Sequence, residues 1–132
     1  MTWHQEETYK GLIQLSQRGL RFGPVINGGG AVALLALLGN LYGKGAAIDG
    51  FELPMICYIT GIGLSGFAYI TSYLTQLFLY NEGLAQNEPA TKITHTKWLN
   101  VTLILIMLSI VTFCAGSYLG VSALSATSSG GI

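Results

Sequence analysis

Residues 55–80, MICYITGIGLSGFAYITSYLTQLFLY, decide the fold, because this stretch contains no Asp, Glu, Lys, Arg or His. A helix needs about 20 apolar residues to cross the hydrocarbon core of a bilayer. Two further stretches, 25–42 and 98–124, also lack charged residues and histidine. All six basic and all six acidic residues lie before or between these stretches. The pattern predicts a small membrane protein with three transmembrane helices.

The composition agrees with this prediction. Charged residues make up 9% of the 132 residues and hydrophobic residues 51%, whereas a soluble domain averages about 25% charged residues. The net charge of zero argues against a nucleic-acid partner. We therefore expect an all-α integral membrane protein, in which residues 1–132 form one unit with an N-terminal amphipathic helix and three transmembrane helices.

The N-terminal helix is predicted over residues 2–22. Apolar residues and one serine recur along one face at spacings of three and four, and polar residues recur along the other. The first face holds Tyr9, Leu12, Ile13, Ser16 and Leu20, and the second holds Lys10, Gln14, Gln17 and Arg21. Such a helix either lies in the headgroup zone or packs as the collar of an oligomer, and the sequence leaves both open.

The chain is then expected to break or bend at Gly23-Pro24, because proline suits the first turn of a helix better than its interior. The three predicted spans are 25–43, 54–80 and 98–124, followed by a flexible Ser/Gly-rich tail over 125–132. Five of the six Lys and Arg residues lie in the N-terminal segment or the second loop, and only Lys44 lies in the first loop. The positive-inside rule therefore predicts a cytoplasmic N-terminus and an external C-terminus.

Small residues four apart are the strongest local pattern within the spans. They form flat strips on which helices approach closely. The strip either packs the three helices of one chain together or drives self-association. The candidate helix-packing residues are Gly28, Gly29, Gly30, Gly39, Gly43, Gly61, Ser65, Gly116 and Gly120.

Three side-chain amides are predicted to lie at a matched depth. Counted from the predicted span ends, Asn27, Gln76 and Asn100 fall about one turn inside the cytoplasmic boundary. Buried amides need hydrogen-bond partners. We expect these residues to bond across helices, or to line a hydrated vestibule in an oligomer.

Several activities are not expected. Ion-coupled transporters place charged residues inside the bilayer, and these spans contain none, although a passive pore remains consistent with them. The match to G-x-G-x-x-G at residues 61–66 lies inside a span and follows no strand, so a nucleotide site is rejected. His4 and His95 stand apart without metal-ligand spacing. We predict no catalytic, cofactor or metal residues and no enzyme, and we interpret Cys57 and Cys114 as small apolar residues sooner than a disulfide.

The run from Val25 to Gly39, VINGGGAVALLALLG, resembles a segment of small, mostly uncharacterised bacterial membrane proteins. In these proteins a polar N-terminal helix precedes an I-N-G-G-A-type first span, and two more spans follow. The resemblance implies a multi-pass protein of the bacterial inner membrane and transfers no activity.

Two functions fit the sequence. The first is a self-associating protein in the lipid bilayer that forms a pore, as holins and membrane-acting defence effectors do. The second is a non-conducting anchor or accessory subunit of a larger membrane protein complex.

Overall fold

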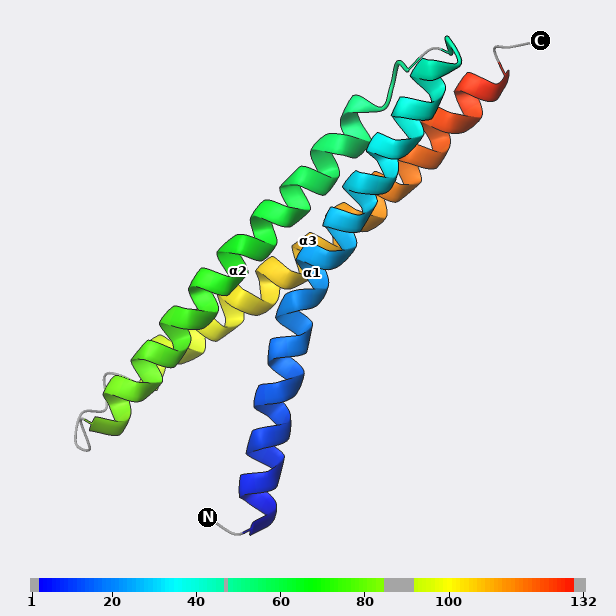
Figure 1. The fold of residues 1–132 in the computed structure, drawn as a ribbon. Helices are drawn as coiled ribbons and strands as arrows, with labels where there is room; N and C mark the ends of the chain where they lie inside the picture. The colour runs from blue at the N-terminus through cyan, green and yellow to red at the C-terminus, as the bar shows by residue number, and fades with distance from the viewer. Residues whose placement is uncertain (1–2, 47, 85–91, 130–132) are drawn as a thin grey trace.

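The computed structural model describes residues 3–46, 48–84 and 92–129, and these residues form three helices and no strand. The helices are α1, Trp3–Gly43, α2, Glu52–Leu84, and α3, Lys92–Ser129. Figure 1 shows α2 and α3 side by side, with the second half of α1 packed beside them and the first half leading away toward the N-terminus. We call the end of the bundle where α1 ends and α2 begins the upper end.

The predicted start of the first span, at residue 25, is wrong. α1 runs without interruption from Trp3 through Pro24 to Gly43. Pro24 bends the helix where the two halves diverge in Figure 1, but it does not open a new helix. A proline inside a helix has no N–H for the carbonyl four residues earlier, and its ring crowds that carbonyl. Residues 3–22, which we call the arm, are therefore the first half of α1.

The end of α1 has a clear stop signal. Gly45 adopts a left-handed φ of 68°, a conformation that glycine reaches without steric strain. The Ala46 amide donates to the Leu41 carbonyl at 3.0 Å, and the Gly45 amide donates to the Tyr42 carbonyl at 3.0 Å. This pair of bonds is the Schellman motif, which satisfies carbonyls at a helix end.

α3 is longer than predicted at both ends. It begins at Lys92 and continues to Ser129, so residues 125–129 of the predicted flexible tail are helical, while residues 130–132 lie outside the described part of the chain. Side-chain hydroxyls bond back to the helix here: Ser129 Oγ donates to the Ser125 carbonyl at 3.1 Å. In bonds of this kind, each serine hydroxyl has a backbone carbonyl of its own helix as its acceptor.

The apolar core lies at the upper end of the bundle. Leu34 of α1, Phe51 of the connecting segment and Tyr58 of α2 are its buried members, and Phe113 of α3 packs against them. Farther down, α2 and α3 meet through Thr71 and Thr102, whose hydroxyls are 2.7 Å apart. Most other large apolar side chains are exposed. Each helix also contains a stretch long and apolar enough to cross a membrane, so these exposed side chains suit contact with lipid.

Candidate functional site

The centre of the molecule is a buried polar cluster where the three helices meet. It consists of Asn27 from α1, Gly61 and Ser65 from α2, and Ser109 from α3, and we call it the polar junction. The side chains of Asn27, Ser65 and Ser109 are at most 2% exposed. Buried polar groups without partners are costly in an apolar medium, so their hydrogen bonds decide whether this arrangement is stable.

Asn27 joins α1 to α3. Its Nδ2 donates to the Gly23 carbonyl at 3.0 Å, to the Ser109 carbonyl at 3.1 Å and to Ser109 Oγ at 3.0 Å. Its Oδ1 is buried without a hydrogen-bond partner among the described residues. The Nδ2 bonds therefore fix which way the amide points.

The serine hydroxyls join α2 to α3. Ser109 Oγ donates to the Gly61 carbonyl at 2.9 Å and lies 2.8 Å from Ser65 Oγ. Ser65 Oγ also reaches the Gly61 carbonyl of its own helix at 2.9 Å. Networks of this kind within a low-dielectric interior hold helices in one register.

Two glycines make room for the polar junction. A Cβ at Gly61 would overlap the Asn27 side chain, and a Cβ at Gly23 would overlap Ser65 Oγ. Both helices therefore approach more closely than any larger residue would allow.

Above the junction, the ring of Tyr58 fills the space between two further glycines. A Cβ at Gly30 would overlap this ring, and a Cβ at Gly116 would lie 3.1 Å from it. The Tyr58 hydroxyl is 3.1 Å from Ser117 Oγ, and the ring centroid is 6.0 Å from that of Phe113. Tyr58 is thus a wedge from α2 that contacts both α1 and α3.

The predicted packing residues divide into two groups. Five of them lie against neighbouring helices: Gly30, Gly61, Ser65, Gly116 and Gly120. A Cβ at Gly120 would lie 3.8 Å from Pro54. An ideal Cβ at the other four would meet no heavy atom within 4 Å, and these are Gly28, Gly29, Gly39 and Gly43. The Cβ positions of this second group therefore face open space within the described part of the chain.

The predicted matched depth of the three amides is wrong for Asn27 only. Gln76 and Asn100 share a level, because they lie between the Thr71–Thr102 and Phe78–Trp98 contacts that join α2 to α3. Asn27 lies beside Gly61, whereas Gln76 is about 22 Å farther down α2 by helical rise. Gln76 and Asn100 are both exposed. The prediction counted depth from a helix start near Val25, but α1 begins well before that residue.

Sequence reasoning also missed Gly23, Tyr58 and Ser109. A usable signal existed for Ser109, because it is the only hydroxyl residue between Thr102 and Thr112. Cys57 and Cys114 are free thiols.

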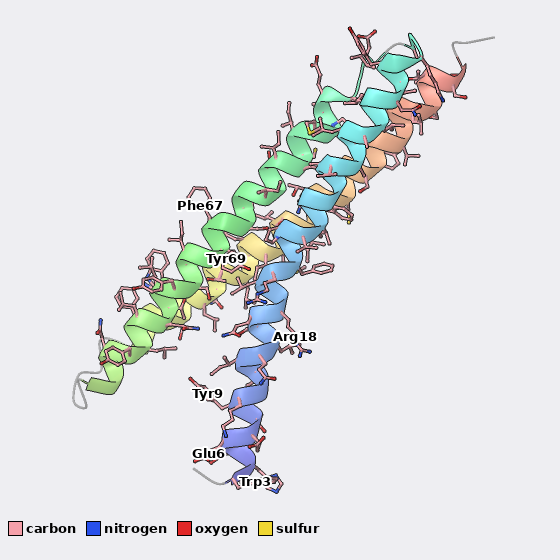
Figure 2. The ribbon with its side chains drawn as sticks, in the orientation of Figure 1. Trp3, Glu6, Tyr9, Arg18, Phe67 and Tyr69 are labelled. Atoms are coloured by element: carbon pink, nitrogen blue, oxygen red, sulfur yellow. The ribbon has the colours of Figure 1, made fainter. Side chains whose placement is uncertain are left out.

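The arm carries a second polar feature, on the side that faces away from the bundle. Gln14, Gln17, Arg18 and Arg21 line a shallow hollow, and we call these four residues the basic face. Figure 2 shows Arg18 on the side of α1 away from α2, and Tyr9 on the side toward α2. Two residues of the arm, Ile13 and Leu20, are half-buried, and the rest are exposed.

The basic face lies level with an apolar part of the bundle. α1 and α2 are antiparallel, with Asn27 beside Gly61 and Gly23 beside Ser65. Continuing this register down the arm brings Arg21 to the level of Phe67, which is the middle of the charge-free stretch 55–80. The charge-free stretches of α1 and α2 are thus offset by about half a membrane thickness.

The fold and these features define a class. Three helices that are long and apolar enough to cross a membrane make this chain a multi-pass membrane protein. Comparison of the chain with known protein families, with curated proteins and with solved structures finds no match.

Proposed function

We propose that this protein associates with copies of itself in the membrane and that the assembly encloses a water-filled pore lined by the arm of α1. The observation that carries this proposal is the position of the basic face. Arg18 and Arg21 are level with the charge-free middle of α2. Arg18 lies on the side of α1 away from α2 (Figure 2), and Arg21 shares its hollow. Apart from the amides of Gln14 and Gln17 in the same hollow, the described part of the chain presents no polar surface to them.

The energetics of burial support a shared aqueous space. An arginine at the centre of a bilayer costs roughly 2.5–3.5 kcal/mol on the insertion scale, and each copy has two at this level. Copies arranged around an axis would turn their basic faces toward one another and toward water. In this arrangement the arm acts as an amphipathic collar, with Ile13 and Leu20 toward α2 and the basic face toward the axis.

Uncovered small residues support self-association. Four exposed glycines have open space at their Cβ positions: Gly39 and Gly43 of α1, and Gly63 and Gly66 of α2. A closed ring needs two different surfaces on each copy, one for each neighbour. The two glycine surfaces lie on different helices, which provides that pair.

We place the protein in the inner membrane of a bacterium, with its N-terminus in the cytoplasm. The support for this orientation is the distribution of Lys outside the charge-free stretches, because Lys10, Lys92 and Lys97 lie in the N-terminal segment and the second loop, while the α1–α2 connection has only Lys44.

The experiment is a measurement of membrane potential in bacteria during titrated induction. We expect depolarisation with the natural chain and none with Gly39→Ile/Gly63→Ile, which adds bulk to both uncovered surfaces. Neither substitution meets a heavy atom within 4 Å of its Cβ position, so each copy keeps its own packing. Ala115→Ile is the control, because Ala115 is an exposed small residue of α3, which carries neither surface. Equal depolarisation by the double variant and the natural chain would overturn the ring.

The second candidate is a non-conducting subunit of a larger membrane complex. The same uncovered glycines favour it, because they would pack equally well on a different protein. The mass of the protein purified in lipid nanodiscs separates the two functions: a homo-oligomer supports the pore, and a monomer supports the subunit.

A further inference from the structure

We propose that the pore selects small inorganic anions, through a ring of guanidinium groups from Arg18 and Arg21. This inference rests on the proposed pore and assigns the chemical class that passes through it. Pores that conduct anions are lined by Arg and Lys, and pores that conduct cations are lined by Asp and Glu.

The first support is the composition of the hollow. Two guanidiniums, three residues apart and so on one side of the helix, share it with the amides of Gln14 and Gln17. Both groups donate N–H bonds to an anion, and a guanidinium accepts none. Within the described part of the chain, no carboxylate lines the hollow.

The second support is that the positive charge is not neutralised nearby. Among the described residues, neither guanidinium forms an ion pair, and the ion pair of the arm joins Lys10 to Glu7 at 3.5 Å. Glu7 is about 16 Å below Arg18 by helical rise. At the upper end, Glu52 begins α2 and is about 22 Å above Phe67, the residue of α2 that is level with Arg21, by the same measure.

Those distances exceed the range over which charges act in salt solution. The screening length is about 10 Å at 0.1 M ionic strength, so these carboxylates do not offset the arginines. At the same level α2 presents Phe67 and Ile70, which carry no charge. The field at this level of the pore is therefore positive in every copy.

The size of the effect follows from the potential that such a ring produces. A potential of about one kT raises the local anion concentration and lowers the cation concentration about 2.7-fold each, which makes a ratio of about sevenfold. Each copy adds two permanent charges to the ring. We therefore expect a chloride-to-potassium permeability ratio of roughly five to ten in the natural protein.

The test is the reversal potential of the full-length protein in planar bilayers of neutral lipid, under a gradient of potassium chloride. The reversal potential does not depend on how many pores insert, so partial loss of folding in a variant does not alter it. Arg18→Gln/Arg21→Gln should bring the ratio close to one, and Arg18→Glu/Arg21→Glu should invert it toward potassium. The matched control, Arg18→Lys/Arg21→Lys, keeps the charge and should keep the anion preference.

The outcomes separate the selectivity from the pore itself. A natural protein that conducts without anion preference, or a Gln variant that retains it, would overturn the selectivity and leave the pore standing. A natural protein that conducts no current at any protein-to-lipid ratio would overturn the pore, and the selectivity with it.

Discussion

Asn27 Nδ2 lies 3.0 Å from Ser109 Oγ, and this bond joins the first helix to the third between residues 82 positions apart in the chain. The amide also bonds the carbonyls of Gly23 and Ser109. It thereby fixes α1 at the residue where the helix enters the bundle, directly above the bend at Pro24. The arm below that point is exposed except at Ile13 and Leu20.

Replacing Asn27 with alanine should destabilise the three-helix bundle. The change removes the Nδ2 donor that is shared among Ser109 Oγ and the carbonyls of Gly23 and Ser109, which costs about 1–3 kcal/mol. Asn40→Ala is the matched control, because Asn40 is an exposed amide on the same helix. Thermal unfolding in detergent, followed by circular dichroism, should show the loss for the first variant only. Equal melting of the two variants would exclude the polar junction as a stabilising element.

Gly61→Ala and Gly63→Ala should have opposite effects on stability. A Cβ at Gly61 overlaps the Asn27 side chain, whereas a Cβ at Gly63 meets nothing within 4 Å. We expect Gly61→Ala to destabilise the bundle by about 1–3 kcal/mol through overpacking. Gly63→Ala should stabilise α2 by about 0.5–1 kcal/mol, because alanine loses less backbone entropy in a helix. Denaturant unfolding of the pair measures both, and two changes of the same sign would contradict the close contact at Gly61.

The Tyr58 hydroxyl and Ser117 should be coupled. Their oxygens are 3.1 Å apart and half-buried, so a net hydrogen bond of about 0.5–1.5 kcal/mol is expected. A double-mutant cycle with Tyr58→Phe and Ser117→Ala isolates that coupling from the packing of the ring. Additive effects of the two substitutions would show that the ring packs between Gly30 and Gly116 without the hydrogen bond.

Pro24→Ala should reduce the bend in α1. Alanine restores the N–H that the helix lacks at this position and removes the ring that crowds the preceding turn. The distance between spin labels at Tyr9 and Tyr73, placed by substitution with cysteine in a Cys57→Ala/Cys114→Ala background, should then shorten. An unchanged distance would show that the direction of the arm is set by something other than the proline.

The long apolar stretches could be predicted from the sequence, because a run of about 20 residues without charge is typical of a helix that faces lipid and rare in a soluble domain. The continuation of α1 through Pro24 could not be predicted, because the residues around a proline are similar whether it starts a helix or lies inside one. Because the depth of Asn27 was counted from a helix start near Val25, Asn27 was predicted at the level of Gln76 and Asn100, where it does not lie.

The division of the glycines could not be predicted either. Gly39 and Gly61 sit in similar small-xxx-small patterns, yet only Gly61 lies against another helix. Which side of a helix faces its neighbours depends on the register of all three helices. The register here is set by Asn27 and Ser109, and the sequence does not show that these two residues bond to each other.

Cysteine accessibility tests most directly whether the basic face of the arm borders water in the assembled protein. Gln17→Cys and Leu20→Cys, in the same Cys57→Ala/Cys114→Ala background, place a thiol on the basic face and on the half-buried side toward α2. We predict that a charged, membrane-impermeant thiol reagent modifies position 17 in lipid vesicles and blocks the current, while position 20 stays unmodified. Modification of position 20 alone, or modification of position 17 with no change in current, would contradict a pore lined by the arm.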